Sequence, residues 1–146
     1  MNLTKTATVL AALVLAGCAS INPVAYNAQP ERIRDPQKEI VSLLLANTVQ
    51  GCVTEPQIDE KMLVVKYVCN TFIGNVVARF DKVDKIYLEQ SGEWFRVTAH
   101  HSSGIADFQW TSKSLDDMQR LADALTAMTP GQGGGLGIKG KKANPV

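Results

Sequence analysis

The sequence predicts an α+β domain in which an antiparallel sheet of about five or six strands packs against one helix at each end. Apolar residues recur at helical spacing after Asp35 and again after Ser114. Between these two segments, short runs are rich in β-branched and aromatic residues, as strands are. The connections between these runs are too short for parallel crossovers, so we expect an antiparallel meander.

The length and charge of the chain are those of one small domain. Its 146 residues are the length of a single typical domain. Residues 35–130, the predicted domain, contain nine basic and 13 acidic side chains, a net charge of −4. A mildly acidic body lacks the positive surface that nucleic acid requires, so we expect no nucleic-acid partner.

The first helix is predicted to begin at Asp35-Pro36, because Asp caps helix amides and Pro is tolerated in the first turn. Its apolar stripe includes Ile40, Leu43 and Leu44. We expect this stripe to pack against the sheet. The alternative, a helix lying on a membrane, would have more cations on its polar face than Lys38 alone.

Six segments predict strands, of which residues 61–69 are the strongest because β-branched residues dominate them. Residues 85–89 and 94–99 are expected to form a hairpin around the turn at 90–93. The six predicted strands cover residues 51–55, 61–69, 75–80, 85–89, 94–99 and 105–111.

The last helix is predicted to begin at Ser114, which is followed three residues later by Asp117 in a variant of the capping box. Its apolar face comprises Leu115, Met118, Leu121, Ala122, Leu125 and Met128, and Pro130-Gly131 ends it. The acids Asp116, Asp117 and Asp123 are expected on its solvent side. The predicted strands are followed by Trp110-Thr111-Ser112, just before the helix, and by the stretch 121–125 within it. This part of the chain resembles the end of a pleckstrin-homology-like domain.

The N-terminus is typical of a secretory signal, which is removed from the mature protein. It has one cation, Lys5, followed by an apolar run over residues 7–17. A membrane-spanning helix needs roughly 20 apolar residues, about twice the length of this run. We therefore expect residues 1–17 to be a cleaved signal peptide.

The end of this run, Leu15-Ala16-Gly17-Cys18, resembles the lipobox of bacterial lipoprotein precursors. The resemblance implies a diacylglycerol thioether on Cys18, cleavage before that residue, and acylation of the new amino group, for example by palmitate. In that family an Asp after the cysteine retains the protein at the inner membrane. Ala19 and Ser20 stand here instead, which implies lipid anchoring in the outer membrane, facing the periplasm.

Lipidation of Cys18 would leave Cys52 and Cys69 as the remaining cysteines. A translocated bacterial domain folds in an oxidising compartment, so we predict a Cys52–Cys69 disulfide. Two buried unpaired cysteines are the alternative.

The segments that flank the domain are expected to lack regular structure. Residues 18–34, which contain the lipidated cysteine, have Pro and Asn but no periodicity, and they predict an extended tether. Residues 131–146 predict a flexible, Gly-rich, basic tail. The spacing of Gly135, Gly137 and Gly140 matches a dinucleotide fingerprint, but no strand and helix surround it, so we expect no cofactor.

No residue pattern predicts catalysis or a metal site. His100 and His101 are adjacent, so on a strand they would point to opposite faces and could not share a metal, and a solvated turn is expected there. Ser102 and Ser103 lack the strand–elbow–helix context of a hydrolase nucleophile. We therefore expect no catalytic residue, no metal and no enzymatic activity.

The leading functional hypothesis is a non-enzymatic lipoprotein that binds or scaffolds another envelope protein, or a second copy of itself. Trp94 and Trp110 are the candidate partner surface if they face outward, although aromatic residues at strand spacing are more often core. The alternative is a small-ligand or lipid-binding module, in which the sheet and the closing helix enclose a cavity.

Overall fold

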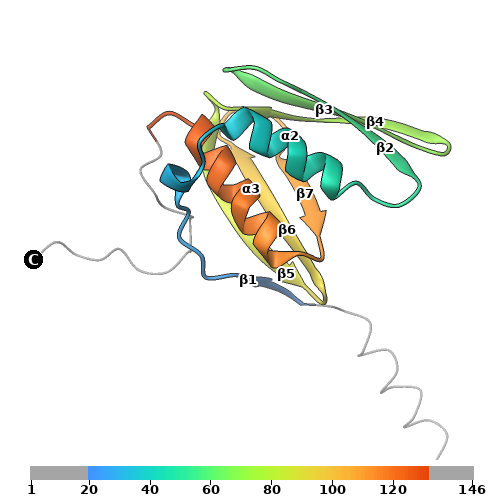
Figure 1. Ribbon diagram of the computed structural model, residues 1–146, viewed down its shortest axis with the longest axis horizontal. Coiled ribbons are helices and arrows are strands. Elements are labelled where there is room, and N and C mark those ends of the chain that lie inside the picture. Colours follow the sequence, from blue (N-terminus) through green and yellow to red (C-terminus); the bar gives the residue numbers. More distant parts are fainter. Residues whose placement is uncertain (1–19, 132–146) are drawn as a thin grey trace, which may run out of the picture.

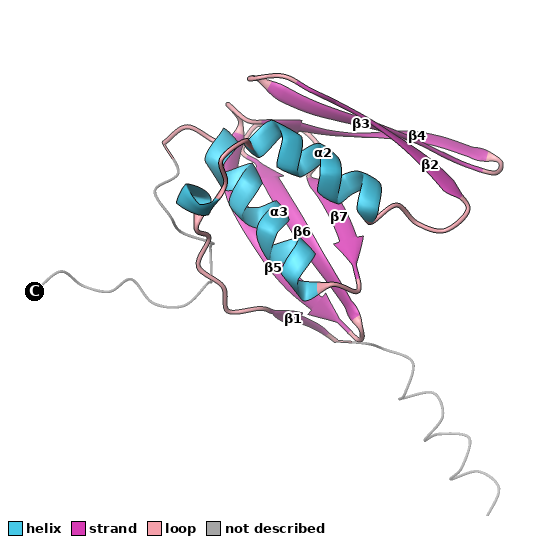
Figure 2. Cartoon of the chain, viewed as in Figure 1, coloured by secondary structure: helices cyan, strands magenta, loops and turns pink. Residues whose placement is uncertain are grey.

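The computed structural model describes residues 20–131 and has the predicted α+β class, with strands and two α-helices (Figures 1 and 2). The elements in chain order are β1 (Ile21–Pro23), the short 3-10 helix η1 (Pro30–Arg32), α2 (Pro36–Ala46), β2 (Cys52–Ile58), β3 (Met62–Cys69), β4 (Phe72–Arg79), β5 (Val83–Ser91), β6 (Trp94–His101), β7 (Phe108–Ser112) and α3 (Leu115–Met128).

The strands form two antiparallel sheets instead of the single meander that the sequence predicts. One sheet has the order β1-β5-β6-β7 and the other the order β2-β3-β4. The chain passes from one sheet to the other at a tight turn after β4, where Lys82 N–H donates to the Arg79 carbonyl. Alternation along a strand predicts its two faces, but it does not say which neighbour the strand joins.

Both α-helices begin where the sequence predicts. The Asp35 side chain accepts a hydrogen bond from Lys38 N–H (3.1 Å), and the Ser114 hydroxyl accepts one from Asp117 N–H (3.2 Å). The apolar stripe of α2 is buried, as expected for a helix packed in the core. The fully buried large apolar side chains are Ile40, Leu44, Leu63, Val65, Phe80, Val97, Phe108, Met118, Leu121 and Leu125.

The segment before α2 differs from the predicted extended tether over residues 18–34. Ile21–Pro23 pairs with β5 as an edge strand, and Val24 N–H continues the pairing to the Leu88 carbonyl (2.8 Å). Ala28 is buried, and η1 lies against α3 (Figure 1). Each of these contacts is made by an individual residue and not by a repeating face, so the segment shows no hydrophobic periodicity in the sequence.

Asp123 fixes this segment to α3, so the expectation that Asp123 lies on the solvent side of the helix is wrong. Its side chain is only 1 % exposed. The Tyr26 hydroxyl donates to its carboxylate (2.8 and 2.9 Å), and the Gln29 amide N–H donates as well (2.7 Å). Burial, together with the hydrogen bond to this carboxylate and its negative charge, raises the pKa of Tyr26 to about 12.

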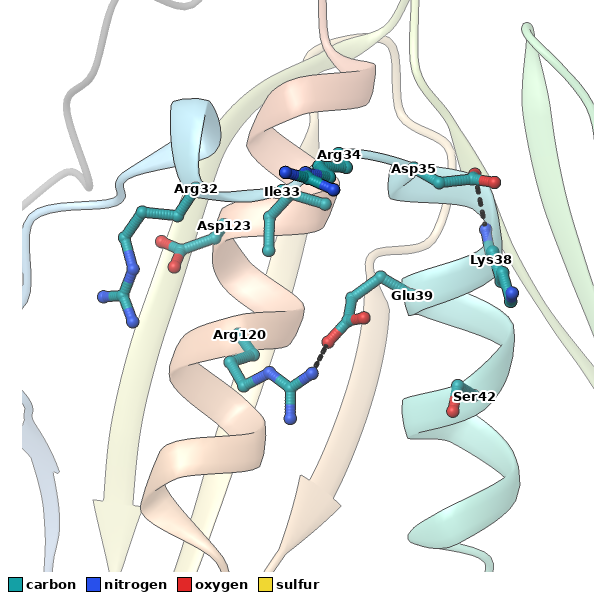
Figure 3. A pocket seen from close by; sticks show the side chains of 9 residues that line it. All are labelled: Arg32, Ile33, Arg34, Asp35, Lys38, Glu39, Ser42, Arg120 and Asp123. Atoms are coloured by element: carbon teal, nitrogen blue, oxygen red, sulfur yellow. Dashed lines mark hydrogen bonds and ion pairs between the residues drawn. The ribbon is translucent and has the colours of Figure 1, made fainter.

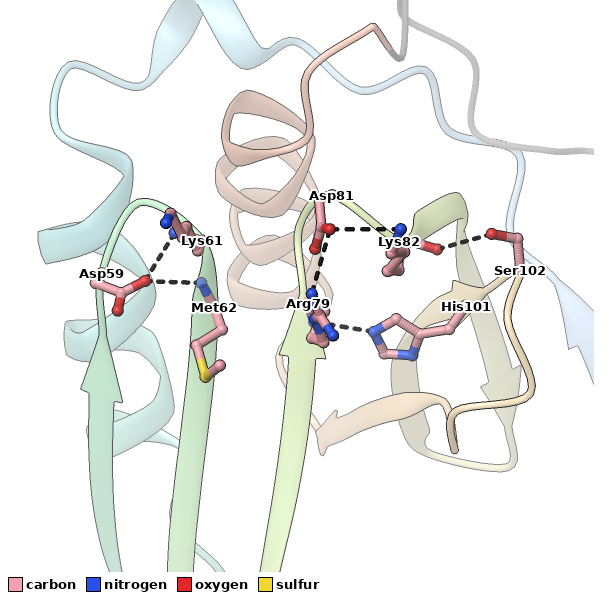
Figure 4. A network of polar contacts seen from close by, with 8 residues as sticks. All are labelled: Asp59, Lys61, Met62, Arg79, Asp81, Lys82, His101 and Ser102. Atoms are coloured by element: carbon pink, nitrogen blue, oxygen red, sulfur yellow. Dashed lines mark hydrogen bonds and ion pairs between the residues drawn. The ribbon is translucent and has the colours of Figure 1, made fainter.

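His101 links the two sheets, which corrects the prediction of a solvated turn there (Figure 4). It is the last residue of β6 and is buried. Its Nε2 accepts a hydrogen bond from Arg79 N–H at the end of β4 (3.0 Å), and its Nδ1 lies 3.0 Å from the Ala106 carbonyl. Both contacts are satisfied by one neutral tautomer with the proton on Nδ1, so the side chain has a structural role.

Candidate functional site

The predicted disulfide is present and joins Cys52 to Cys69, with an S–S distance of 2.03 Å. These two residues face each other across the β2–β3 ladder, so the bond closes the outer end of this hairpin. Figure 1 shows that the three-stranded sheet extends past the end of α2. The disulfide therefore cross-links a part of the sheet that the helices do not cover.

A groove of about 350 Å³ lies between this end of the three-stranded sheet and β7. Apolar side chains and the disulfide form most of its wall. The residues that line it are Val49, Cys52, Thr54, Tyr67, Cys69, Val76, Gln109, Trp110 and Thr111. β7 is the last strand of its sheet, and no strand of residues 20–131 is hydrogen-bonded to its outer edge, although β4 of the other sheet lies near it.

Two aromatic residues in the groove are held by packing against neighbours. The Tyr67 ring lies over Gly74 on the adjacent strand, where the Cβ of any other residue would overlap the ring. The Phe72 ring lies 5.7 Å from it, centroid to centroid. The Trp110 ring is nearly parallel to that of Phe108, at 6.5 Å. The wall is therefore preorganised, which reduces the entropy lost when a partner binds.

Exposed apolar side chains gather at the same end of the sheet. We call Val53, Phe72 and Ile73 the hairpin tip; they are 59, 58 and 67 % exposed. Phe72 pairs with Cys69 and so shares the face of the disulfide and the groove, whereas Val53 and Ile73 both pair with Val68 and lie on the opposite face of the sheet. An exposed aromatic ring beside an apolar groove is typical of a binding site.

The structure separates the two tryptophans that the sequence singles out. Trp110 pairs with Val97 on β6, three residues after Trp94, so the two side chains lie on opposite faces of the sheet. Trp110 is half-buried and lines the groove. Trp94 is 44 % exposed, and the Lys113 ammonium lies 5.1 Å from its ring centroid. They therefore belong to two different surfaces.

A second hollow, of about 410 Å³, is polar and lies between the segment before α2, α2 itself and α3 (Figure 3). Its acids are already engaged: Asp35 caps α2, Glu39 forms an ion pair with Arg120, and Asp123 binds Tyr26 and Gln29. The lining cations are Arg32, Arg34, Lys38 and Arg120. These contacts identify the hollow as the junction that joins both helices to the N-terminal segment.

The two adjacent histidines and Ser102, which could suggest catalysis, are engaged in structural contacts. His100 Nδ1 lies 2.9 Å from the Asp107 carboxylate, and its Nε2 lies 4.0 Å from Asp84. The Ser102 hydroxyl donates to the Lys82 carbonyl instead of to a histidine. Burial alone would raise the pKa of Asp107, but hydrogen bonds from His100 and from the His101 amide lower it overall. Within residues 20–131 no group of three or more potential ligands could hold a metal.

Cys18, the predicted signal peptide 1–17 and the Gly-rich tail after Gly131 lie outside the described residues. Across residues 20–131, neither α-helix is long and apolar enough to cross a bilayer. Comparison of the chain with protein-family models, with curated proteins and with solved structures gives no match.

Proposed function

We propose that this chain is a bacterial lipoprotein, held in the outer membrane by acyl chains on Cys18 and facing the periplasm. Its domain would bind an apolar, extended segment of another envelope protein without catalysing a reaction. The lipobox Leu15-Ala16-Gly17-Cys18 supports the anchor. The Cys52–Cys69 disulfide is consistent with an oxidising compartment outside the cytoplasm.

The groove beside β7 is the observation on which the binding function depends. Its wall offers two preorganised aromatic rings, Tyr67 and Trp110, of the kind that anchor protein interfaces. The outer edge of β7 pairs with no strand of residues 20–131, which is compatible with addition of a strand from the bound segment. At the hairpin tip, the exposed Phe72 extends the apolar surface beyond the groove, on the face that carries the disulfide. An extended apolar peptide fits all three features.

The second candidate function is binding of a small apolar ligand or a lipid in the same groove. Its volume of about 350 Å³ falls within the range of roughly 300–1,000 Å³ that small-molecule sites occupy. A ligand of this kind would contact the groove wall and leave Phe72 exposed, whereas a polypeptide would cover both the groove wall and Phe72.

Photo-crosslinking in cells tests the binding function. A benzoylphenylalanine at Val49 or at Gln109, both exposed residues of the groove, is expected to form a covalent adduct with one envelope protein. The same probe at Phe72 should capture that protein too. Glu60 is the matched control, because it is exposed at the opposite end of the same sheet and should give no such adduct.

The mass of the adduct distinguishes the partners. An adduct with the mass of two chains would identify a second copy as the partner. Adducts of a few hundred daltons at Val49 and Gln109, with none at Phe72, would favour the small-ligand function. Equal adducts at Glu60 and in the groove would contradict a specific partner site.

A further inference from the structure

The described chain begins at one end of the four-stranded sheet, beside an exposed tryptophan. Ile21 pairs with Ser91 on β5, and Ser91 pairs with Trp94 on β6. Residues that pair directly across strands point to the same face, so these three side chains form one row. Ile21 is 57 % and Trp94 44 % exposed. A hollow of about 110 Å³ lies between them, also lined by Thr111.

The distance between this row and the proposed lipid is limited by covalent geometry. Only Ala19 and Ser20 separate Cys18 from Ile21. A chain extends by at most about 3.6 Å per residue, so Ile21 lies within about 11 Å of Cys18 whatever path the chain takes. The acyl chains of a lipidated Cys18 must lie in the bilayer, which places the row at or near the lipid headgroups.

We propose that Ile21 and Trp94 form a membrane-docking surface, which inserts into the bilayer interface and orients the domain. This inference depends on the proposed lipidation of Cys18. Tryptophan favours this position because its ring is apolar and its indole N–H is polar, which matches the headgroup region. The three-stranded sheet, which carries the hairpin tip, projects away from this end of the molecule (Figure 1).

The charges around the row balance each other. Arg96 pairs with Glu89 (2.7 Å), and Lys113, which lies over the Trp94 ring, pairs with Glu93 (2.7 Å). These residues have no net charge to attract an anionic surface. Docking should therefore be driven by the two apolar side chains, and it should be the same on zwitterionic and anionic bilayers at low or high salt.

Fluorescence quenching tests the docking surface. The lipidated full chain, purified from membranes, is reconstituted in phosphatidylcholine vesicles brominated near the headgroup or deep in the acyl chains. The Trp94→Phe variant isolates the contribution of Trp94 from that of Trp110. The fluorescence of Trp94 is the difference in emission between the unsubstituted chain and the Trp94→Phe variant. We expect bromines near the headgroup to quench this fluorescence and bromines deep in the acyl chains to leave most of it. The double variant Trp94→Phe/Phe72→Trp places the same probe on the hairpin tip and should not be quenched.

The outcomes separate this inference from the proposed function. If the purified chain has no lipid and does not bind vesicles, the anchor itself is refuted. If the lipidated chain binds vesicles but bromines quench Trp94 no more than the probe at Phe72, the docking surface is refuted while the anchor stands. A soluble chain that starts at Ala19 shows whether Trp94 is quenched without an anchor; we expect little quenching, since two side chains bind too weakly alone.

Discussion

Replacing Asp123 by alanine is expected to lower the free energy of unfolding by about 3 kcal/mol. The substitution leaves two donors without their acceptor, the Tyr26 hydroxyl and the Gln29 amide. It also opens the polar junction that joins the N-terminal segment to α3. Urea denaturation of the soluble domain measures the change. Hydrogen exchange should increase most at the Gln29 amide, because its acceptor is lost, beyond the general increase that a lower global stability causes.

Asp116→Ala is the matched control, because Asp116 is exposed on the same helix and has no hydrogen bond among those found in residues 20–131. Its effect should stay within about 0.5 kcal/mol, as for most surface substitutions. If Asp123→Ala is as mild as Asp116→Ala, the buried carboxylate does not hold the N-terminal segment.

Replacing both Cys52 and Cys69 by alanine is expected to destabilise the domain by about 3 kcal/mol, because the bond closes a loop with a sequence separation of 17. Hydrogen exchange should increase most at the outer ends of β2, β3 and β4, which the helices do not cover. The groove should lose its partner adducts, since the disulfide is part of its wall.

Urea midpoints of the oxidised protein, the reduced protein and the double variant provide the measurement. The reduced protein and the double variant should agree, because both lack the same cross-link. A double variant as stable as the oxidised protein would contradict a stabilising role for the bond. The single variants are less useful, since each leaves one reactive thiol.

The elements that the sequence predicts well are those determined by residues close together in the chain. Asp35 and Ser114 cap their helices through amides three residues away, so each cap is readable from a short window. The strand predicted over residues 61–69 is β3 (Met62–Cys69), because β-branched residues fill it. Cys52 and Cys69 belong to adjacent strands, and their pairing follows from a short hairpin.

The features that the sequence does not predict depend on residues far apart in the chain. Asp123 looks like a surface acid on a capped helix, and only Tyr26 and Gln29, more than 90 residues earlier, make it a buried acceptor. His101 is buried, and its Nε2 accepts a hydrogen bond from the Arg79 amide of the other sheet. The groove is also nonlocal: its walls come from the β2–β4 sheet, from Val49 after α2 and from β7. No local periodicity encodes these contacts.

The central claim is that a lipid on Cys18 holds this domain at a membrane. Tandem mass spectrometry of the N-terminal peptide, from protein expressed with its own N-terminus in bacteria and extracted from membranes, tests it most directly. We expect the peptide to begin at Cys18, with a diacylglyceryl thioether on sulfur and an acyl chain on the amino group. A peptide that begins at Met1, or a Cys18 with a free thiol, would contradict it.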